Sequence, residues 1–183
     1  MLAYSLMNQG ARHKIFPTTQ RRGVGTLLMF VVRNLFSNAA YRRDVFADLV
    51  AQGHLDRSIL SEADPLGFLL AEGGAESITD AAYRYARHEQ GADVILFGTG
   101  NKDHVKANVD SILRPPLPGP VVERLHRTFG HLSGVGLDLP GPVKANVESI
   151  LRPPLPAPVI ERLHASFGHL TGVGLDLPGP VKA

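Results

Sequence analysis

The chain of 183 residues contains no cysteine, which excludes disulfide bonds, thiolate metal ligands and a cysteine nucleophile. Because disulfides are not needed, a reducing compartment is the simpler interpretation, and we expect a cytoplasmic location. Long hydrophobic runs are also missing, since the longest predominantly apolar stretch, residues 24–32, is far short of the roughly 20 residues that a membrane-spanning helix needs. The N-terminus lacks a basic segment followed by a long apolar one, so we expect no targeting signal and no membrane partner.

Acidic residues are missing from the first part of the chain. Residues 1–43 contain seven Arg and Lys residues and no acid, whereas residues 44–100 contain ten acids and three Arg or Lys residues. A basic segment can attract a phosphate-bearing ligand, but its arginines are more commonly the solvated ends of helices or strands. The arginines concerned are Arg21, Arg22, Arg42 and Arg43. Aromatic and basic residues are not interleaved as on nucleic-acid-binding surfaces, so we expect no nucleic-acid partner.

Apolar patterning predicts alternating strands and helices in a chain that is 44% hydrophobic and 20% charged. Three apolar segments predict strands, over residues 2–7, 24–32 and 93–97. Two helices are predicted between them, over residues 40–52 and 78–88. The first would bury Val45, Phe46, Leu49 and Val50. The second would begin after Ser77, with Asp80 three residues later, in a variant of the capping box. Such alternation implies parallel pairing and an α/β fold class.

The strongest pattern is an internal repeat. Residues 105–142 recur as residues 143–180, at a period of 38 residues, and residues 181–183 begin a third copy. The two copies differ at six positions, which are Asp110/Glu148, Gly119/Ala157, Val122/Ile160, Arg127/Ala165, Thr128/Ser166 and Ser133/Thr171. This similarity indicates a recent duplication.

Each copy predicts an extended stretch followed by an amphipathic helix. Residues 114–118 are Arg-Pro-Pro-Leu-Pro, and consecutive prolines exclude a helix there. Apolar residues then recur at helical spacing until Gly130, which would end the helix. They are Val121, Val122, Leu125, Phe129 and Leu132, repeated in the second copy as Val159, Ile160, Leu163, Phe167 and Leu170. Neither helix can bury its apolar face alone.

A glycine-containing turn, Gly98-Thr99-Gly100-Asn101, follows the third predicted strand. Small residues let backbone N–H groups approach an anion, and the N-terminus of the following helix adds unpaired donors. That helix would carry Val105, Val109, Ile112 and Leu113 on one face. The geometry suits a phosphate, although most turns of this kind only connect two elements.

The sequence around this turn is similar to the aldo/keto reductase family. Its last barrel strand and helix resemble Ile95-Leu96-Phe97-Gly98-Thr99-Gly100-Asn101-Lys102-Asp103-His104-Val105-Lys106-Ala107-Asn108. Residues 3–8 resemble the sixth strand, residues 23–30 the seventh strand and residues 74–82 the start of the final helix. The resemblance covers about residues 1–135 and is best over residues 74–108.

The resemblance implies a (β/α)8 TIM barrel that reduces carbonyls, or oxidises sugars and alcohols, with NADP or NAD. It implies a partial barrel of about the last three βα units in residues 1–113, a tail segment in residues 114–142 and a duplicated tail in residues 143–183. By resemblance, the cofactor-binding residues are Gly98, Thr99, Gly100 and Asn101 around the adenosine phosphate, His104 near it and Asn108 at the adenine.

Two departures from the family pattern bear on the cofactor. His104 stands where many NADPH-dependent members have an arginine, and histidine is a weaker phosphate partner. Ala107 replaces the Glu or Gln often found beside the adenine. The choice between NADP and NAD therefore stays open.

The family's acid–base residues, an Asp, a Tyr, a Lys and a His, lie at the ends of strands two to four, which have no counterpart here. We therefore assign no catalytic residue and expect a truncated oxidoreductase that binds a dinucleotide weakly without turnover of its own. Tyr83 and Tyr85 lie on a predicted helix, where core packing or surface placement is a commoner role than catalysis. His126 and His131 do not share a helical face, so we expect no metal site.

About three βα units cannot close a barrel, which leaves strand edges open. Open edges predict self-association or pairing with a complementing N-terminal fragment. A second hypothesis is a proline-rich interaction module, because residues 114–120 contain a PxxP pattern and the duplicated copies could bind an aromatic groove bivalently. No basic residue stands at the offset that usually sets the peptide's direction, so we interpret Pro115 and Pro116 as structural.

Overall fold

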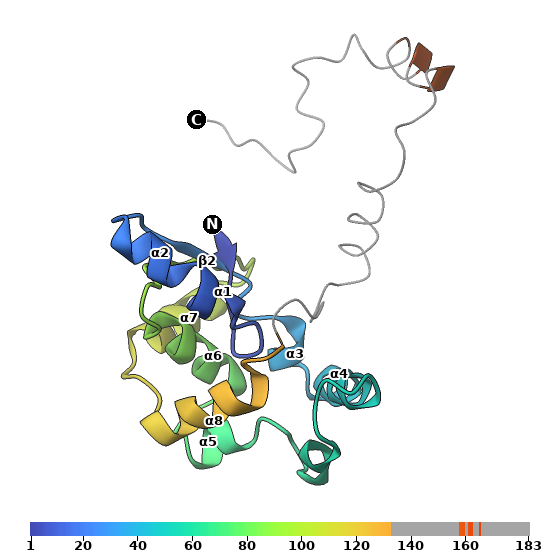
Figure 1. Cartoon of the computed structure of the whole chain (residues 1–183), viewed down its shortest axis with the longest axis vertical. Coiled ribbons are helices and arrows are strands. Elements are labelled where there is room, and N and C mark those ends of the chain that lie inside the picture. The colour runs from blue at the N-terminus through green and yellow to red at the C-terminus, as the bar shows by residue number, and fades with distance from the viewer. Residues whose placement is uncertain (133–157, 160, 163–164, 166–183) are drawn as a thin grey trace. The chain divides into compact units, whose positions relative to one another are not determined.

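The computed structural model describes residues 1–132, 158, 159, 161, 162 and 165 (Figure 1). The chain divides into two units, Met1–Asp138 and Leu139–Ala183. All elements below belong to the first unit.

A small parallel sheet forms in this unit. Its strands are β1 (Leu2–Ala3), β2 (Leu27–Met29) and β3 (Val94–Ile95), in the spatial order β1-β2-β3. Leu28 lies between Leu2 and Ile95 in the register. The prediction of three parallel strands is confirmed. Each strand is shorter than predicted, and the central strand β2 has three residues although it has a hydrogen-bonded neighbour on both sides.

The helices include both that were predicted upstream of the third strand. They are α1 (Gly10–Lys14), α2 (Phe16–Arg21), α3 (Asn34–Ser37), α4 (Ala39–Ala51), the 3-10 helix η1 (Arg57–Ser61), α5 (Phe68–Ala71), α6 (Ile78–Arg87), α7 (Lys102–Leu113) and α8 (Gly119–Phe129). The Ser77 side chain accepts a hydrogen bond from the Asp80 N–H at the start of α6, as predicted. The Asp80 carboxylate accepts from the Glu76 N–H, one residue before the position that a standard capping box uses.

The core lies between one face of the sheet and the helices. Leu28 is fully buried on this face, and Tyr4, which follows β1, is buried beside it. Helix α6 lies in the middle of the unit and contacts α3, α5, α7 and β3 (Figure 1). Its residues Tyr83 and Tyr85 are both buried, so of the two roles expected for them, core packing and surface placement, the structure shows core packing.

The other face of the sheet is apolar and exposed. Side chains alternate along a strand, so Leu27 and its partner Val94 project from the face opposite Leu28. Leu27 is 39% exposed and Val94 is 47% exposed. Just beyond the strand ends, Phe30 and Leu96 are exposed as well.

The first proline-rich stretch and α8 dock on the core. Val121, Leu125 and Phe129 of α8 are buried, as is Leu132 just beyond it. The helix ends at Gly130, where an added Cβ would lie 2.5 Å from the His126 carbonyl oxygen. Of the second copy's predicted apolar face only Val159 is among the described residues. Ile160, Leu163, Phe167 and Leu170 lie outside them.

Helix α7 forms as predicted, but most of the apolar residues predicted on one of its faces are exposed. Val105 is 42% exposed, Val109 40% and Leu113 76%, and only Ile112 is partly buried against the core. The reason is that α7 packs on α6 with a different side, on which Asn108 is half-buried. None of the helices within the described residues has the length and apolar character to cross a bilayer.

Candidate functional site

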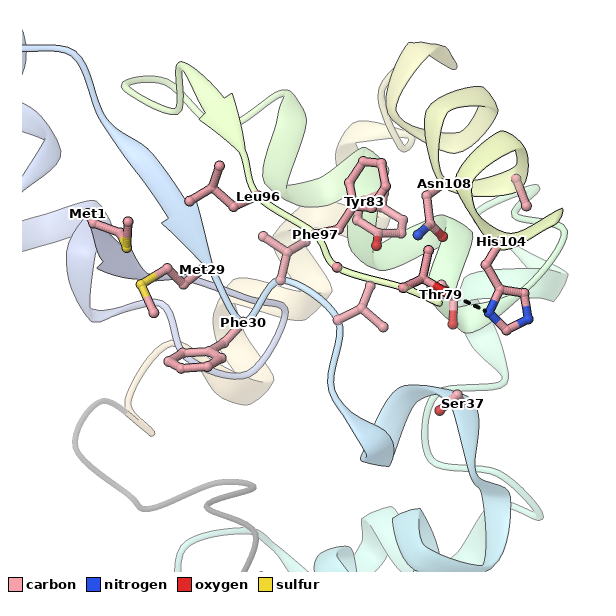
Figure 2. A pocket seen from close by; sticks show the side chains of 15 residues that line it. Met1, Met29, Phe30, Ser37, Thr79, Tyr83, Leu96, Phe97, His104 and Asn108 are labelled. Carbon is pink, nitrogen blue, oxygen red and sulfur yellow. Dashed lines mark hydrogen bonds between the residues drawn. The ribbon is translucent and has the colours of Figure 1, made fainter. Parts of the chain in front are cut away.

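A cavity of about 670 Å³ opens at the carboxyl ends of β2 and β3. Its lining comes from the segments that leave the two strands and from α3, α6 and α7, with Met1 from the N-terminus (Figure 2). The lining residues are Met1, Met29, Phe30, Val31, Val32, Ser37, Thr79, Tyr83, Leu96, Phe97, Gly98, Thr99, His104, Ala107 and Asn108. Parallel sheets place binding sites at this edge, because the loops leaving neighbouring strands converge there.

One end of the cavity is polar. Figure 2 shows Thr79, His104 and Asn108 close together there, each from a helix. The Thr99 hydroxyl lies 3.4 Å from Nδ1 of His104. The His104 ring is exposed, so it is accessible to a ligand entering from solvent. Hydroxyl, imidazole and amide groups at one place can hydrogen-bond both anionic oxygens and the edge of a base.

The N-terminus of α7 lies at this polar end. The Thr99 hydroxyl accepts a hydrogen bond from the Asn101 N–H at 3.1 Å, and the Asn101 side chain accepts from the Asp103 N–H at 2.9 Å. These caps account for two of the four amide donors that a helix N-terminus leaves without intrahelical partners. The remaining donors of the turn and the positive end of the helix dipole favour an anion here.

Gly98 leaves room beside these groups. An added Cβ at Gly98 or at Gly100 would meet no atom within 4 Å, and neither residue has a positive φ. The fold therefore requires glycine at neither position, and the space beside Gly98 remains open for a ligand.

The other end of the cavity is apolar and aromatic. Met1, Met29, Phe30 and Leu96 gather there in Figure 2. Between the two ends, the rings of Tyr83 and Phe97 pack edge to face with centroids 6.0 Å apart. Burial raises the pKa of Tyr83 to about 12, so its hydroxyl keeps its proton at neutral pH.

Phe30 has a strained backbone at the carboxyl end of β2. Its φ is +61°, in the left-handed region that non-glycine residues seldom adopt. Its ring lines the cavity, and the Arg33 guanidinium lies 4.5 Å from the ring centroid. Such strain is concentrated at functional sites, where it fixes the direction of a side chain.

The structure brings together four of the six residues predicted to bind a cofactor. Gly98, Thr99, His104 and Asn108 line the cavity, whereas Gly100 is exposed outside the lining and Asn101 caps α7. The basic residues of the first 43 positions do not join them. Arg21, Arg22 and Arg43 are exposed, while Arg42 is buried in an ion pair with Asp64.

Several lining residues were not predicted from the sequence. Met29 and Phe30 lie inside the strand predicted over residues 24–32, but the observed β2 ends at Met29, so these two residues lie at the carboxyl end where ligands bind in parallel sheets. The strand end was predicted too late in the chain for this signal to be used. Thr79 and Ser37 carry no such signal, since they reach the cavity only through the packing of α6 and α3.

A separate buried cluster surrounds Tyr4. Its hydroxyl lies 2.6 Å from Oε2 of Glu89 and 3.0 Å from the Tyr85 hydroxyl, and Glu89 in turn pairs with Arg12 at 3.4 Å. Burial, followed by the electrostatic effect of Tyr85 and Glu89, raises the pKa of Tyr4. Both tyrosines are therefore neutral packing residues that join β1 to α6.

No family model matches the chain, and no curated protein matches it in sequence. Two solved structures of an aldo-keto reductase from Bacillus halodurans are similar to it. The apo form is 19% identical with a TM-score of 0.42, over 68% of this chain and 41% of that chain. The holo form is 20% identical with a TM-score of 0.41, over 69% of this chain and 42% of that chain. The chain thus spans about two fifths of the length of those structures.

Proposed function

We propose that the cavity binds the adenosine-phosphate end of a nicotinamide dinucleotide, on a segment of an aldo/keto reductase barrel that does not turn over substrate alone. The observation that carries this proposal is the convergence of Gly98, Thr99, His104 and Asn108 in one cavity. In the sequence, these four residues resemble the cofactor-binding residues of that family. The cavity volume, about 670 Å³, lies in the range of small-molecule sites.

The polar end suits the phosphate. The Thr99 hydroxyl and the His104 ring can donate to phosphate oxygens, and the α7 N-terminus adds backbone donors and a favourable dipole. The open space at Gly98 allows the phosphate to approach the backbone, as a side chain there would not.

The middle and the apolar end suit the remainder of the ligand. The Asn108 amide can both donate to and accept from the edge of a purine. Phe97 and Phe30 offer aromatic surface for the flat parts of a dinucleotide, since stacking on aromatic rings is favourable.

Binding without turnover fits the chemistry of the cavity. The lining contains one tyrosine, Tyr83, and burial raises its pKa, which makes it a weaker proton donor than an exposed tyrosine. The family's Asp, Tyr, Lys and His would have to come from a complementing fragment. The other hypothesis, a free proline-rich module, is less well supported, because Arg84 donates hydrogen bonds to the carbonyl groups of Pro115 and Pro116 and holds the first copy on the core.

The test is a titration of the full chain with NADPH and with NADH, following cofactor fluorescence. The chain contains no tryptophan, so the signal comes from the cofactor itself. We expect saturable binding that Gly98→Glu abolishes and His104→Ala weakens by about tenfold, which corresponds to about 1.4 kcal/mol.

Matched controls separate a local effect from general disruption. Gly119→Glu introduces the same charge at another glycine with open space around it, and His13→Ala removes an exposed histidine outside the cavity. Both should bind as the parent does. Equal binding by Gly98→Glu and the parent chain would show that the cavity is not the site.

A further inference from the structure

The core holds one copy of the repeated tail, and the chain carries a second copy with the same contact residues. We name residues 114–132 the first tail segment and residues 152–170 the second tail segment. We propose that the second tail segment can replace the first on the core of the same chain, so that the tail docks in two registers 38 residues apart.

The buried apolar side chains of the first tail segment are all preserved in the second. Five side chains of the first segment are buried on the core, and each has an identical counterpart. The pairs are Leu117/Leu155, Val121/Val159, Leu125/Leu163, Phe129/Phe167 and Leu132/Leu170. Phe129 packs edge to face on Phe46, with ring centroids 5.9 Å apart. The apolar surface that holds α8 therefore fits either segment.

The charged contacts are preserved as well. Arg124 pairs with Glu62 at 2.8 Å and with Glu72 at 2.9 Å, and its guanidinium lies 4.0 Å from the centroid of the Phe68 ring. Its counterpart is Arg162. Similarly, Arg114 pairs with Glu76 and Asp80, and its counterpart is Arg152.

The remaining polar contacts do not depend on side-chain identity in the tail. Arg84 donates to the carbonyl oxygens of Pro115 at 2.8 Å and Pro116 at 3.1 Å, and the Gln9 side chain donates to the carbonyl of Leu125 at 3.1 Å. Backbone carbonyls are present in both segments. Arg84 is itself 7% exposed, so its partners on the tail are needed to satisfy a buried charge.

The two segments differ only where the core tolerates a change. Four positions differ, and none is among the buried ones: Gly119/Ala157, Val122/Ile160, Arg127/Ala165 and Thr128/Ser166. A Cβ added at Gly119 would meet no atom within 4 Å, and Arg127 is exposed. Val122 and Thr128 are half-buried, and their replacements keep a branched apolar chain and a hydroxyl.

The connection allows the exchange within one chain. The tail begins at the end of α7, and a shift of register would loop out residues 114–151, which is 38 residues. The entropy cost of closing a loop grows only slowly with its length. This cost favours the first segment in the native chain, and the second takes over when the first cannot bind.

The test compares three variants of the full chain by thermal unfolding: Phe129→Asp, Phe167→Asp and the double variant. Phe129 is fully buried, so an aspartate there prevents docking of the first segment. We expect Phe167→Asp to melt as the parent does, Phe129→Asp to melt cooperatively a few degrees lower, and the double variant to lose far more than the sum of the two. If Phe129→Asp melts like the double variant, the proposal is overturned. Phe129→Ala and Phe167→Ala give the milder version of the same cycle.

Cross-linking reports the register directly, because the chain has no cysteine of its own. A short bismaleimide should join Glu62→Cys to Arg124→Cys in the parent background, where these side chains are paired. In the Phe129→Asp background, where the first segment cannot dock, we expect Glu62→Cys to join Arg162→Cys within one chain. A product formed only between two chains, or no product, would contradict exchange within the chain.

Discussion

Replacing Arg42 by methionine tests how a buried charge holds α3 and α4 together. Its guanidinium donates to both carboxylate oxygens of Asp64, at 3.0 and 2.5 Å, and to the carbonyl oxygens of Leu35 at 2.9 Å and Phe36 at 3.3 Å. Arg42 itself is 5% exposed. A methionine fills similar volume but satisfies none of these acceptors.

The loss in free energy of unfolding on Arg42→Met follows from the hydrogen-bonding groups that the substitution leaves unpaired. Asp64 keeps the hydrogen bond from the Leu66 N–H. Its side chain is 34% exposed, so water can replace part of the hydrogen bonding that Asp64 loses with Arg42. The two carbonyl groups belong to buried residues, and each unsatisfied buried acceptor costs about 1–3 kcal/mol. We therefore expect the free energy of unfolding to fall by about 3 kcal/mol, below the upper range for breaking a fully buried pair. For a unit of this size that corresponds to a Tm lower by about 10 °C.

The pH dependence provides a second readout. Burial by itself raises the pKa of Asp64, but the hydrogen bonds from Arg42 and the Leu66 N–H outweigh it, so the pKa is lowered. This carboxylate contributes stability above its unfolded pKa, near 3.9, and the contribution is lost as the pH falls through the folded value. The parent chain should thus lose stability below about pH 4 more steeply than Arg42→Met does.

The assay is thermal unfolding by circular dichroism across this pH range, with Arg43→Met as the matched control. Arg43 is the exposed neighbour on the same helix, and its loss should change the free energy of unfolding by less than about 0.5 kcal/mol. Equal melting temperatures for Arg42→Met and Arg43→Met would refute the assigned role of the buried pair.

The remaining predictions concern a glycine with a positive φ, the N-terminal cap of α6, the titration of a histidine and the self-association of the chain. Gly91 has a φ of +94°, and a Cβ added there would lie 2.7 Å from Cβ of Phe16, whereas a Cβ added at Gly23 would meet no atom within 4 Å. In denaturant unfolding, Gly91→Ala should therefore lower the free energy of unfolding more than Gly23→Ala does. Equal losses for the two variants would contradict this. Ser77→Ala should cost about 1 kcal/mol by removing the α6 cap, and Ser77→Thr should restore most of it. Burial, aided by Arg12, lowers the pKa of His126, so stability should fall as the pH drops below about 6.5, and His126→Phe should flatten that part of the Tm profile. The exposed apolar sheet face predicts association that increases with concentration in light scattering, and a monodisperse monomer with a cooperative melt would contradict it.

Hydrophobic periodicity predicted the elements whose side chains meet the core. Helix α6 was predicted from its cap and apolar pattern, and α8 from its repeated apolar face, because in both cases the buried side chains follow the helical period. Helices α1 and α2 were missed. Each buries one residue, Ala11 and Phe16 respectively, which is too few to produce a period.

The candidate site was predicted only in part, for a physical reason. The turn after β3 is contiguous in the sequence, so its residues could be recognised together. The rest of the cavity is assembled by packing: Thr79 arrives on α6, Ser37 on α3 and Met1 from the N-terminus. Likewise, Arg42 could not be distinguished from its exposed neighbours, because its partner Asp64 is brought close only by the fold.

The most direct test of the central proposal is a titration of the full chain with NADPH, followed by backbone amide chemical shifts. The account predicts saturable shifts concentrated at Gly98, Thr99, His104 and Asn108. A second cavity of about 600 Å³, lined by residues including His54 and Arg124, serves as an internal control and should not respond. Shifts confined to that second cavity, or no saturable shifts at the turn after β3, would contradict the proposed function.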